Sequence, residues 1–355
     1  MTNSLFAIYG AYGHTGRLVA SELRARGGEL LLVGRNAEAL RTLADELDAG
    51  DRVRTSAAAV DDTAALREVM TDADVLIQCA GPFAVTGAPV ATAAAEAGCH
   101  YVDHALEPHH VKRVFDTAQA TAQRTGAVMI PGLSFYGGLG DLLAGAVSDG
   151  IAGIDRIVVA YAVNGWRLTT GAKNTATHLF AETERLTFSD GALHAGYVEP
   201  RNAVFPFPPP LGPRSMIAPF PSSEVVTVPR HVPVRNIDLM LSTSTFEAKN
   251  AFESEHIGAA ERAGTDFTVA VQAMWDGGSA AGQLTGHDLW RAGALASVEA
   301  AVRIAEGRGP TKTGVLAPGE AFSAEPFLRE LVRQGAFTLT LRRGEGGQGG
   351  GGGEK

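Results

Sequence analysis

The residues best suited to chemistry form a glycine-rich run directly after the first apolar segment of the chain. The run is Gly10-Ala11-Tyr12-Gly13-His14-Thr15-Gly16, with a G-x-x-G-x-x-G spacing rather than the standard G-x-G-x-x-G. Between a strand and a helix, such glycines allow a tight turn, close approach of the backbone to a pyrophosphate, and close packing of the helix on the sheet. The free amides at the start of that helix attract the phosphates.

This run predicts a dinucleotide-binding loop, because it lies in the strand-before, helix-after context that such motifs require. A purely structural glycine turn is the alternative. The residues expected to contact the dinucleotide are Gly10, Tyr12, Gly13, His14, Thr15 and Gly16.

The end of the second apolar run indicates which dinucleotide is bound. NAD-binding domains usually place Asp or Glu about 20 residues past the glycines, where it binds the ribose 2′-hydroxyl. Here the chain reads Val33-Gly34-Arg35-Asn36, without a carboxylate. An arginine can hold a 2′-phosphate through a forked pair of hydrogen bonds. We therefore predict NADP(H) as the cofactor, bound by Arg35 and Asn36, with a solvated surface charge as the alternative for Arg35.

Two further segments are expected to border the cofactor. Cys79-Ala80-Gly81-Pro82-Phe83 follows the fourth predicted strand. In a doubly wound sheet this loop borders the ligand crevice, so Ala80, Gly81 and Pro82 would form a rigid shelf for the ribose and nicotinamide. Asp61, near the end of the third predicted strand, could reach the adenine, but a role as a helix N-cap explains it without a ligand.

The elements that must position these residues alternate between short apolar runs and helical patterns. This alternation is typical of βαβ units and a parallel sheet. The predicted strands are 5–9, 29–33, 53–57, 74–78, 101–102 and 128–130, and the predicted helices are 14–26, 37–47, 61–70, 89–97 and 109–124. The fold class is therefore α/β, a Rossmann-type doubly wound parallel sheet with a second, mixed α/β domain.

The second half of the chain has a different pattern. We predict strands at 157–163, 225–228, 237–242 and 337–341, and helices at 289–305 and 326–334. The proline-rich segment 205–221 is expected to lack regular structure, and 204–220 is either a lid over the nicotinamide or an irregular loop. The expected domains are 1–135 for NADP binding and 136–343 for the substrate, with a C-terminal helix that could pack back on the first domain. Residues 344–355 form a glycine-rich tail expected to be disordered.

The glycine run, the Gly34-Arg35-Asn36 turn and the Ala80-Gly81-Pro82-Phe83 shelf resemble the saccharopine dehydrogenase-like reductases. The run from Ala97 to Asp103 extends this resemblance, which is specific through about residue 145 and returns weakly at 314–318. It implies a nicotinamide-dependent oxidoreductase with a Rossmann domain and a mixed α/β substrate domain. The family includes saccharopine enzymes, which act on a C–N bond between lysine and a keto acid, and trans-acting enoyl reductases of lipid and polyketide pathways.

One part of the chain departs from that family. Members often carry Gly-Phe-Asp-Ser-x-Pro-Ser-Asp where this chain has Ser134-Phe135-Tyr136-Gly137-Gly138-Leu139-Gly140-Asp141. Only Phe135 and Asp141 match. The substrate edge of the site therefore differs, and saccharopine itself is not the expected substrate.

Hydride transfer belongs to the cofactor, so the protein must orient the substrate and manage one proton. The candidate catalytic residues are His231 first, then Lys173 in the polar stretch 169–175, and Asp103 at the end of the fifth strand together with His104 and Glu107. A surface or hydrogen-bonded polar role is the alternative for each. The Tyr-x-x-x-Lys pair of short-chain dehydrogenases does not occur in a usable place.

Composition limits the other functions. The chain has 355 residues, of which 45% are hydrophobic, and a net charge of −9. This charge disfavours nucleic acid and anionic membranes as partners. With two cysteines, no zinc-type cluster, no expected signal peptide and no apolar run long enough to span a bilayer, we expect a cytoplasmic protein without a metal.

These features predict an NADPH-dependent reductase of a C=C or C=N bond in a small biosynthetic intermediate. The alternative is a non-catalytic NADP(H)-binding regulator that senses redox state. The sizeable second domain favours the enzyme. Substrate identity and reaction direction stay open, as does assembly into a homo-oligomer.

Overall fold

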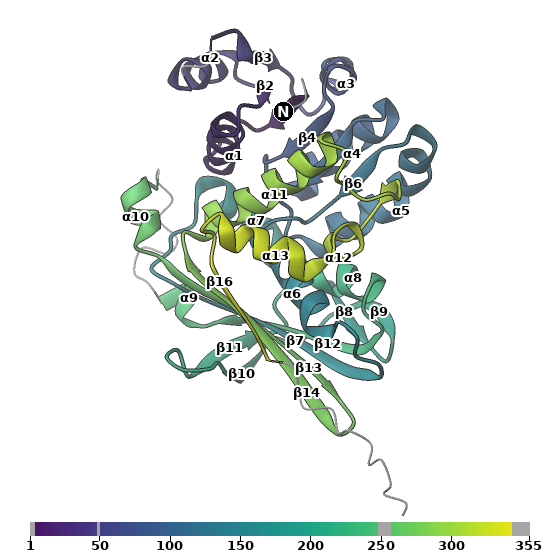
Figure 1. Ribbon diagram of the computed structural model, residues 1–355, viewed down its shortest axis with the longest axis vertical. Helices are drawn as coiled ribbons and strands as arrows, with labels where there is room; N and C mark the ends of the chain where they lie inside the picture. The colour runs from purple at the N-terminus through teal and green to yellow at the C-terminus, as the bar shows by residue number, and fades with distance from the viewer. Residues whose placement is uncertain (1–3, 48–49, 248–256, 343–355) are drawn as a thin grey trace, which may run out of the picture.

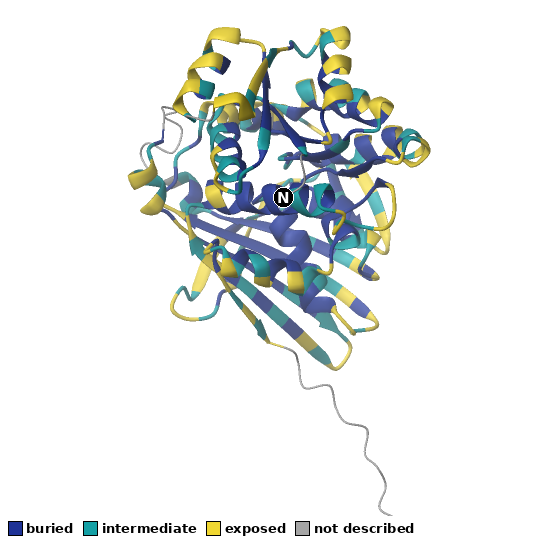
Figure 2. Cartoon of the chain, turned by 45° about the horizontal axis from the view of Figure 1, so that its top comes forward, coloured by how far each residue is buried: buried dark blue, intermediate teal, exposed yellow. Residues whose placement is uncertain are grey.

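Two β-sheets form the framework of the protein (Figure 1). The computed structural model describes residues 4–47, 50–247 and 257–342. The first sheet and its helices lie above the second sheet in Figure 1, and buried residues lie both in the strands of the two sheets and in the helices (Figure 2). The predicted tail 344–355 lies outside the described residues.

The first sheet is parallel throughout its described strands and confirms the predicted doubly wound fold. Its seven strands run in the order β3 (Val53–Ala57), β2 (Glu29–Gly34), β1 (Leu5–Tyr9), β4 (Val75–Gln78), β5 (His100–Asp103), β6 (Val128–Ile130) and β15 (Gly314–Val315). The strand order reverses between β1 and β4. Ligands of such sheets bind at this reversal, outside the carboxyl ends of the strands.

The helices between these strands follow the predicted alternation. They are α1 (His14–Ala25), α2 (Ala37–Glu46), α3 (Thr63–Asp72), α4 (Phe83–Ala97) and α5 (Pro108–Thr125). Asn36 caps α2 by accepting from the amides of Glu38 and Ala39. Glycines in the left-handed conformation, Gly98 and Gly126, end α4 and α5.

Two predicted helix starts were wrong. Helix α4 begins at Phe83 rather than at Pro89, because Pro82 is its N-cap and the Glu107 carboxylate accepts the first helical amide, that of Phe83, at 3.0 Å. Pro89 is tolerated inside the helix. Helix α3 begins at Thr63, and the carboxylate that caps it belongs to Asp62. Asp61 is therefore not the cap.

The second sheet is mixed, as predicted. Its main path is β10 (Arg201–Pro206), β11 (Pro213–Ala218), β12 (Val234–Ser242), β7 (Ile154–Asn164), β13 (Asp266–Trp275), β14 (Gly278–His287) and β16 (Thr338–Arg342). The hairpin of β8 (Arg185–Ser189) and β9 (Ala192–Gly196) joins at β12. Helix α6 (Gly138–Ser148) packs on one face, against β13 and β14.

The interpretation of the proline-rich segment was wrong. Strands β10 and β11 form a regular antiparallel hairpin, with Pro206 paired to Pro213 at its end. The prolines lie at the strand ends and in the turn, where no ladder hydrogen bond is lost. Phe205 and Phe207 pack on β7 and β12 residues. The hairpin lies at the opposite side of the second sheet from the first domain, so the hairpin is not a lid (Figure 1), but Phe220 at the end of the segment 204–220 reaches the cavity described below.

Residues 225–228, predicted as a strand, form helix α8 (Glu224–Thr227) and the start of a 3-10 turn, η2 (Val228–Arg230). Their valines are buried, so an apolar run of this length did not distinguish a short helix from a strand. Among the described helices, none is long and apolar enough to cross a membrane.

The chain returns to the first sheet after β14. Helix α11 (Leu289–Ala305) packs against α1, β4 and β5, and β15 adds to the sheet beside β6. We therefore propose a domain boundary near residue 135. Residues 289–333 form a further segment that packs against strands of both sheets.

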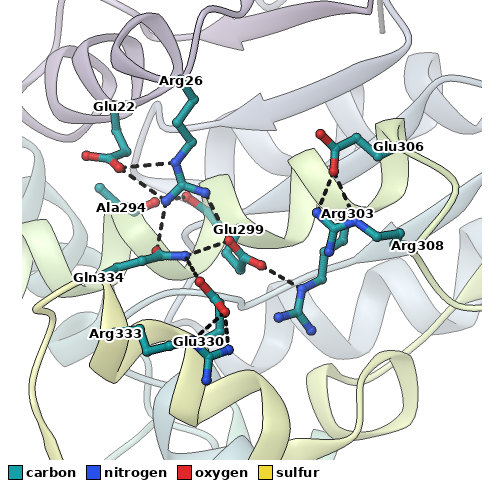
Figure 3. Close-up of polar contacts among 11 residues, drawn as sticks. Glu22, Arg26, Ala294, Glu299, Arg303, Glu306, Arg308, Glu330, Arg333 and Gln334 are labelled. Carbon is teal, nitrogen blue, oxygen red and sulfur yellow. Dashed lines mark hydrogen bonds and ion pairs between the residues drawn. The ribbon is translucent and has the colours of Figure 1, made fainter. Parts of the chain in front are cut away.

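A buried glutamate forms hydrogen bonds that hold the C-terminal segment 289–333 in place. Glu299 on α11 is 4% exposed. Its carboxylate accepts from Arg26 of α1 at 2.9 Å, from Arg303 at 2.6 Å and from Gln334 at 2.8 Å (Figure 3). Gln334 follows α13 (Ala324–Arg333), so one side chain connects three helices.

Replacing Glu299 with alanine is expected to lower the free energy of unfolding by about 3–5 kcal/mol, because it leaves two arginines without their buried partner. The matched control is Glu306→Ala, which removes a more exposed ion pair to Arg308 and should cost at most about 1 kcal/mol. Urea unfolding measures both. Equal effects of the two substitutions would contradict the role of Glu299.

Candidate cofactor and substrate site

A single cavity of about 810 Å³ opens at the carboxyl ends of the first sheet and continues between the two sheets. One end is lined by the glycine loop and Arg35. The other end is lined by side chains of the second sheet, of α7 (Thr170–Ala181) and of α11. The predicted cofactor residues on its wall are Gly10, Tyr12, Gly13, His14, Thr15, Arg35, Ala80, Gly81 and Pro82.

The glycine loop is shaped by close contacts that only glycine permits. Gly10 has φ +80°, and a Cβ there would lie 2.8 Å from the Cβ of Ala80. At Gly16 a Cβ would collide with the carbonyl oxygen of Gly10, so Gly16 packs α1 on the loop and does not line the cavity. Helix α1 begins at His14 with no acidic residue in its first turn. Its free amides suit a pyrophosphate.

Arg35 is the cation at this end that is available to a ligand. Its side chain is exposed on the cavity wall and has no ion pair or hydrogen bond within the described part of the chain. Arg17 also lines the cavity, but its guanidinium is bound to Glu46 and to the carbonyl oxygen of Tyr12. The Tyr12 ring covers Gly34, where a Cβ would lie 2.7 Å from Cε1. The pocket beside Arg35 therefore has an aromatic wall and an unpaired guanidinium, which fits a 2′-phosphorylated adenosine.

Asn36 and Asp61 do not line the cavity. Asn36 uses its carbonyl oxygen to cap α2. Asp61 lies close enough to act on Tyr9: burial raises the pKa of Tyr9, nearby Tyr12 and Asp61 add to this, and Arg35 opposes it. Asp61 thus stands near the Arg35 end, outside the wall.

The predicted shelf is held rigidly from several sides. Gln78 Oε1 accepts the amide of Ala80 at 3.1 Å, and the Thr86 hydroxyl lies within hydrogen-bond distance of the carbonyl oxygens of Ala80 and Pro82. The carboxylate of Glu107 accepts from the amides of Phe83 and Leu106, and burial raises the pKa of Glu107. These bonds fix the loop at the height where the ribose and nicotinamide would rest.

Of the five catalytic candidates, His104 and Glu107 line the cavity, whereas His231, Lys173 and Asp103 do not. Asp103 is fully buried and accepts from Tyr101, His110, Ala105 and Gly132. Burial alone would raise the pKa of Asp103, but His110 and these bonds hold it below its usual value. The Lys173 side chain is exposed on α7. The geometry therefore gives Asp103 a structural role and offers no support for Lys173 in catalysis.

His231 is also placed away from the cavity. Its Nε2 lies 2.9 Å from Asp141 Oδ1, and Asp141 Oδ2 accepts the amide of Gly319 at 2.7 Å. Asp141 thus joins α6 both to the end of η2, through His231, and to α12 (Pro318–Ala321), through Gly319. We do not carry His231 forward as the proton donor, since its position and its bond to Asp141 give it a structural function.

The Asp141 pair predicts a pH-dependent stability. Burial would lower the pKa of His231, but the charge and hydrogen bond of Asp141 raise it above its usual value. The pair therefore stabilises the fold fully below about pH 6.5, and this stabilisation is lost as the pH rises through the raised pKa. His231→Ala should cost about 1–3 kcal/mol at pH 6 and clearly less at pH 9, by urea unfolding. An equal cost at both pH values would contradict the ion pair.

The other end of the cavity is an aromatic chamber. Sequence reasoning missed most of it, because its side chains come from segments that are far apart in the chain. Its members are Phe135, Tyr136, Trp166, Leu168, Leu179, Phe220, Leu241, Phe246, Leu289 and Trp290. The rings contact one another: the ring centroids of Trp166 and Trp290 lie 6.3 Å apart in a tilted arrangement, and those of Tyr136 and Phe220 lie 5.3 Å apart, edge to face. Burial raises the pKa of Tyr136, whose hydroxyl is buried without a partner among the described residues.

The fold and the cavity define a Rossmann-type dinucleotide-binding protein whose second, mixed sheet closes the cofactor crevice. Sequence comparison then identifies the first domain. Residues 6–130 match the family described as the saccharopine dehydrogenase NADP-binding domain. The N-terminal part of the chain is therefore an NADP-binding domain of the saccharopine dehydrogenase type, which confirms the predicted cofactor and resemblance.

Similar proteins share this domain. A probable mitochondrial saccharopine dehydrogenase-like oxidoreductase of Arabidopsis thaliana is 30% identical over 140 residues. A putative trans-acting enoyl reductase of Mycobacterium tuberculosis is 30% identical over 133 residues, and a trans-acting enoyl reductase of Mycobacterium ulcerans is 32% identical over 132. Each match covers 36% of this chain and only 31% of the relative.

The likeness in three dimensions extends further. Saccharopine dehydrogenase (L-Glu forming) from Saccharomyces cerevisiae superposes with a TM-score of 0.65, covering 96% of this chain and 99% of that one. The sequences are 12% identical, so this match establishes the fold of both domains and nothing more.

Proposed function

We propose that the protein is an NADPH-dependent reductase of a carbon–carbon double bond in an apolar small molecule. The observation that carries this proposal is the continuity of the cavity. It begins at the glycine loop and Arg35, passes the Ala80–Pro82 shelf, and ends in the aromatic chamber without a break. A cofactor held along the first part would bring its nicotinamide to the mouth of the chamber, as the doubly wound fold requires.

The distribution of charge favours C=C over C=N. Condensation products of amino acids and keto acids carry several carboxylates, which need arginine or lysine partners. Among the described residues of the cavity wall, the arginines Arg17 and Arg35 stand at the glycine-loop end, and the chamber has neither Arg nor Lys. Burying a carboxylate there unpaired would cost several kcal/mol. An uncharged unsaturated substrate has no such cost.

The residues of this chain have three tasks in such a reaction. The bound NADPH supplies the hydride. The glycine loop and Arg35 bind the cofactor, and the aromatic side chains hold an apolar substrate flat and exclude water. Tyr136 keeps its proton at neutral pH, since burial raises its pKa, and its buried hydroxyl donates to a substrate oxygen once the side chain turns toward the cavity.

The test compares two substrate classes. Purified protein with NADPH is offered benzylideneacetone and chalcone, which are apolar unsaturated ketones, and separately lysine with oxoglutarate. We expect cofactor oxidation with the ketones and none with the charged pair. Oxidation only with lysine and oxoglutarate would overturn the proposal.

The same assay addresses the non-catalytic alternative. A regulator would bind NADPH with no saturated product from any unsaturated ketone, and its affinity for NADPH would be unchanged by Trp166→Ala or Phe220→Ala. In an enzyme, these two substitutions should raise KM for the ketone while the Kd of NADPH stays constant, because both residues belong to the chamber.

A further inference from the structure

Two polar side chains at the shelf have no part in the function described so far. His104 follows β5, and its amide donates to the carbonyl oxygen of Gln78 at the end of β4. Thr175 lies on α7, with its hydroxyl oxygen 2.9 Å from where a Cβ at Gly81 would be. Both line the cavity, from opposite domains. Thr175 therefore lies directly beside Gly81, and His104 lines the same cavity from the end of the neighbouring strand.

The contacts of His104 are compatible with a tautomer in which Nε2 carries the proton. Its Nε2 lies 2.8 Å from Ser297 Oγ, and the hydroxyl of Ser297 donates to the carbonyl oxygen of Ala294 at 3.0 Å. With its one proton on the carbonyl oxygen of Ala294, the Ser297 hydroxyl accepts from His104, and Nε2 then carries the hydrogen. Burial lowers the pKa of His104 to about 4, so the ring is neutral at physiological pH. Nδ1 therefore presents a lone pair, with no partner among the described residues.

Thr175 offers the complementary group. Most helical threonines here donate to the carbonyl oxygen four residues earlier, as Thr177 does to Lys173 at 2.9 Å. No such bond is formed by Thr175, although its residue is only 8% exposed. A hydroxyl that forgoes this local bond and lines the cavity above Gly81 is available as a donor to a ligand.

We propose that Thr175 and His104 hold the carboxamide of the nicotinamide ring on the Ala80–Pro82 shelf. The Thr175 hydroxyl donates to the carboxamide oxygen, and Nδ1 of His104 accepts from the carboxamide nitrogen. A neutral amide is the ligand class that matches one donor and one acceptor without charge. The pair fixes one face of the ring toward the aromatic chamber, and it acts by positioning. This inference rests on NADP(H) occupying the cavity as proposed above.

Calorimetry with three ligands tests the pair. They are NADP⁺, its acetylpyridine analogue, in which a methyl group replaces the amide nitrogen, and phospho-ADP-ribose bearing the 2′-phosphate but no nicotinamide. Thr175→Val and His104→Phe should each weaken NADP⁺ binding about 5–10-fold, the scale of one hydrogen bond. Binding of phospho-ADP-ribose should not change. Thr177→Val is the matched control on the same helix and should change nothing.

The analogue isolates His104. Wild-type protein should prefer NADP⁺ to the acetylpyridine analogue about 5–10-fold, and His104→Phe should bind the two equally. Ser297→Ala, which keeps the imidazole but releases its tautomer, should give an intermediate preference and serves as the second variant if His104→Phe does not fold.

Two outcomes are distinguishable failures. Absence of NADP⁺ binding by wild-type protein overturns the proposed function together with this inference. Retained NADP⁺ binding with equal losses for phospho-ADP-ribose, or an unchanged preference in His104→Phe, overturns only the carboxamide site.

Discussion

Replacing Gly13 with valine is expected to lower NADPH affinity by at least about 100-fold while the chain still folds. Gly13 lines the cavity at the N-cap of α1, and a Cβ there would already lie 3.1 Å from the carbonyl oxygen of Gly10. The two further methyl groups of valine would occupy the space above the helix amides. Loss of two charge-assisted hydrogen bonds to a pyrophosphate accounts for a factor of this size.

The fold should survive because the backbone of Gly13 is ordinary. Its φ is −71° and its ψ is 168°, a conformation open to any residue, so backbone strain is not the cause of the loss. Calorimetry with NADPH and a thermal unfolding curve measure the two effects separately. Gly13→Ala is the graded control and should lose less affinity. Undiminished NADPH binding by Gly13→Val would place the phosphates elsewhere.

Replacing Arg35 with alanine is expected to weaken NADPH binding by about 1.5–3 kcal/mol and to leave NADH affinity nearly unchanged. The guanidinium has no other partner among the described residues, so its loss affects only a ligand that carries a 2′-phosphate. Arg17, engaged with Glu46, cannot substitute for it.

Arg41→Ala is the matched control, since Arg41 is an exposed arginine of α2 that does not line the cavity. It should change neither affinity. Equal losses of NADPH and NADH in Arg35→Ala would contradict the assignment of the 2′-phosphate. A loss as large in Arg41→Ala would show a general effect of surface charge instead.

The cofactor half of the site could be predicted because its information is local. Buried parallel strands are continuous apolar runs, and β1, β2 and β4 read that way along the chain. Each is followed at once by its functional loop. Gly10, Arg35 and Gly81 could therefore be predicted from their positions directly after a strand, and all three line one cavity in the structure.

The substrate half could not be predicted in the same way. Its apolar strands β7 and β12 could be predicted, but others, such as β14, carry small residues and lack a strong apolar signal. The aromatic chamber combines side chains as distant as Phe135 and Trp290, which only the tertiary fold brings together. His231 was predicted as a proton donor because a histidine has a near-neutral pKa. Its partner Asp141 lies 90 residues away in the sequence, so the sequence could not indicate the structural role of this pair. The role of the Thr175 hydroxyl could not be predicted, because Thr175 lies in the polar stretch 169–175, whose sequence does not show which side chain faces the cavity.

The most direct test of the account is a single-turnover label transfer. The protein is mixed with NADPH deuterated at the transferable nicotinamide position and with benzylideneacetone, and the product is examined by mass spectrometry. The account predicts a saturated ketone that carries deuterium on one carbon of the former double bond, the one farther from the carbonyl group. Binding of NADPH without deuterium in the ketone, together with deuterium in a product of lysine and oxoglutarate, would contradict it.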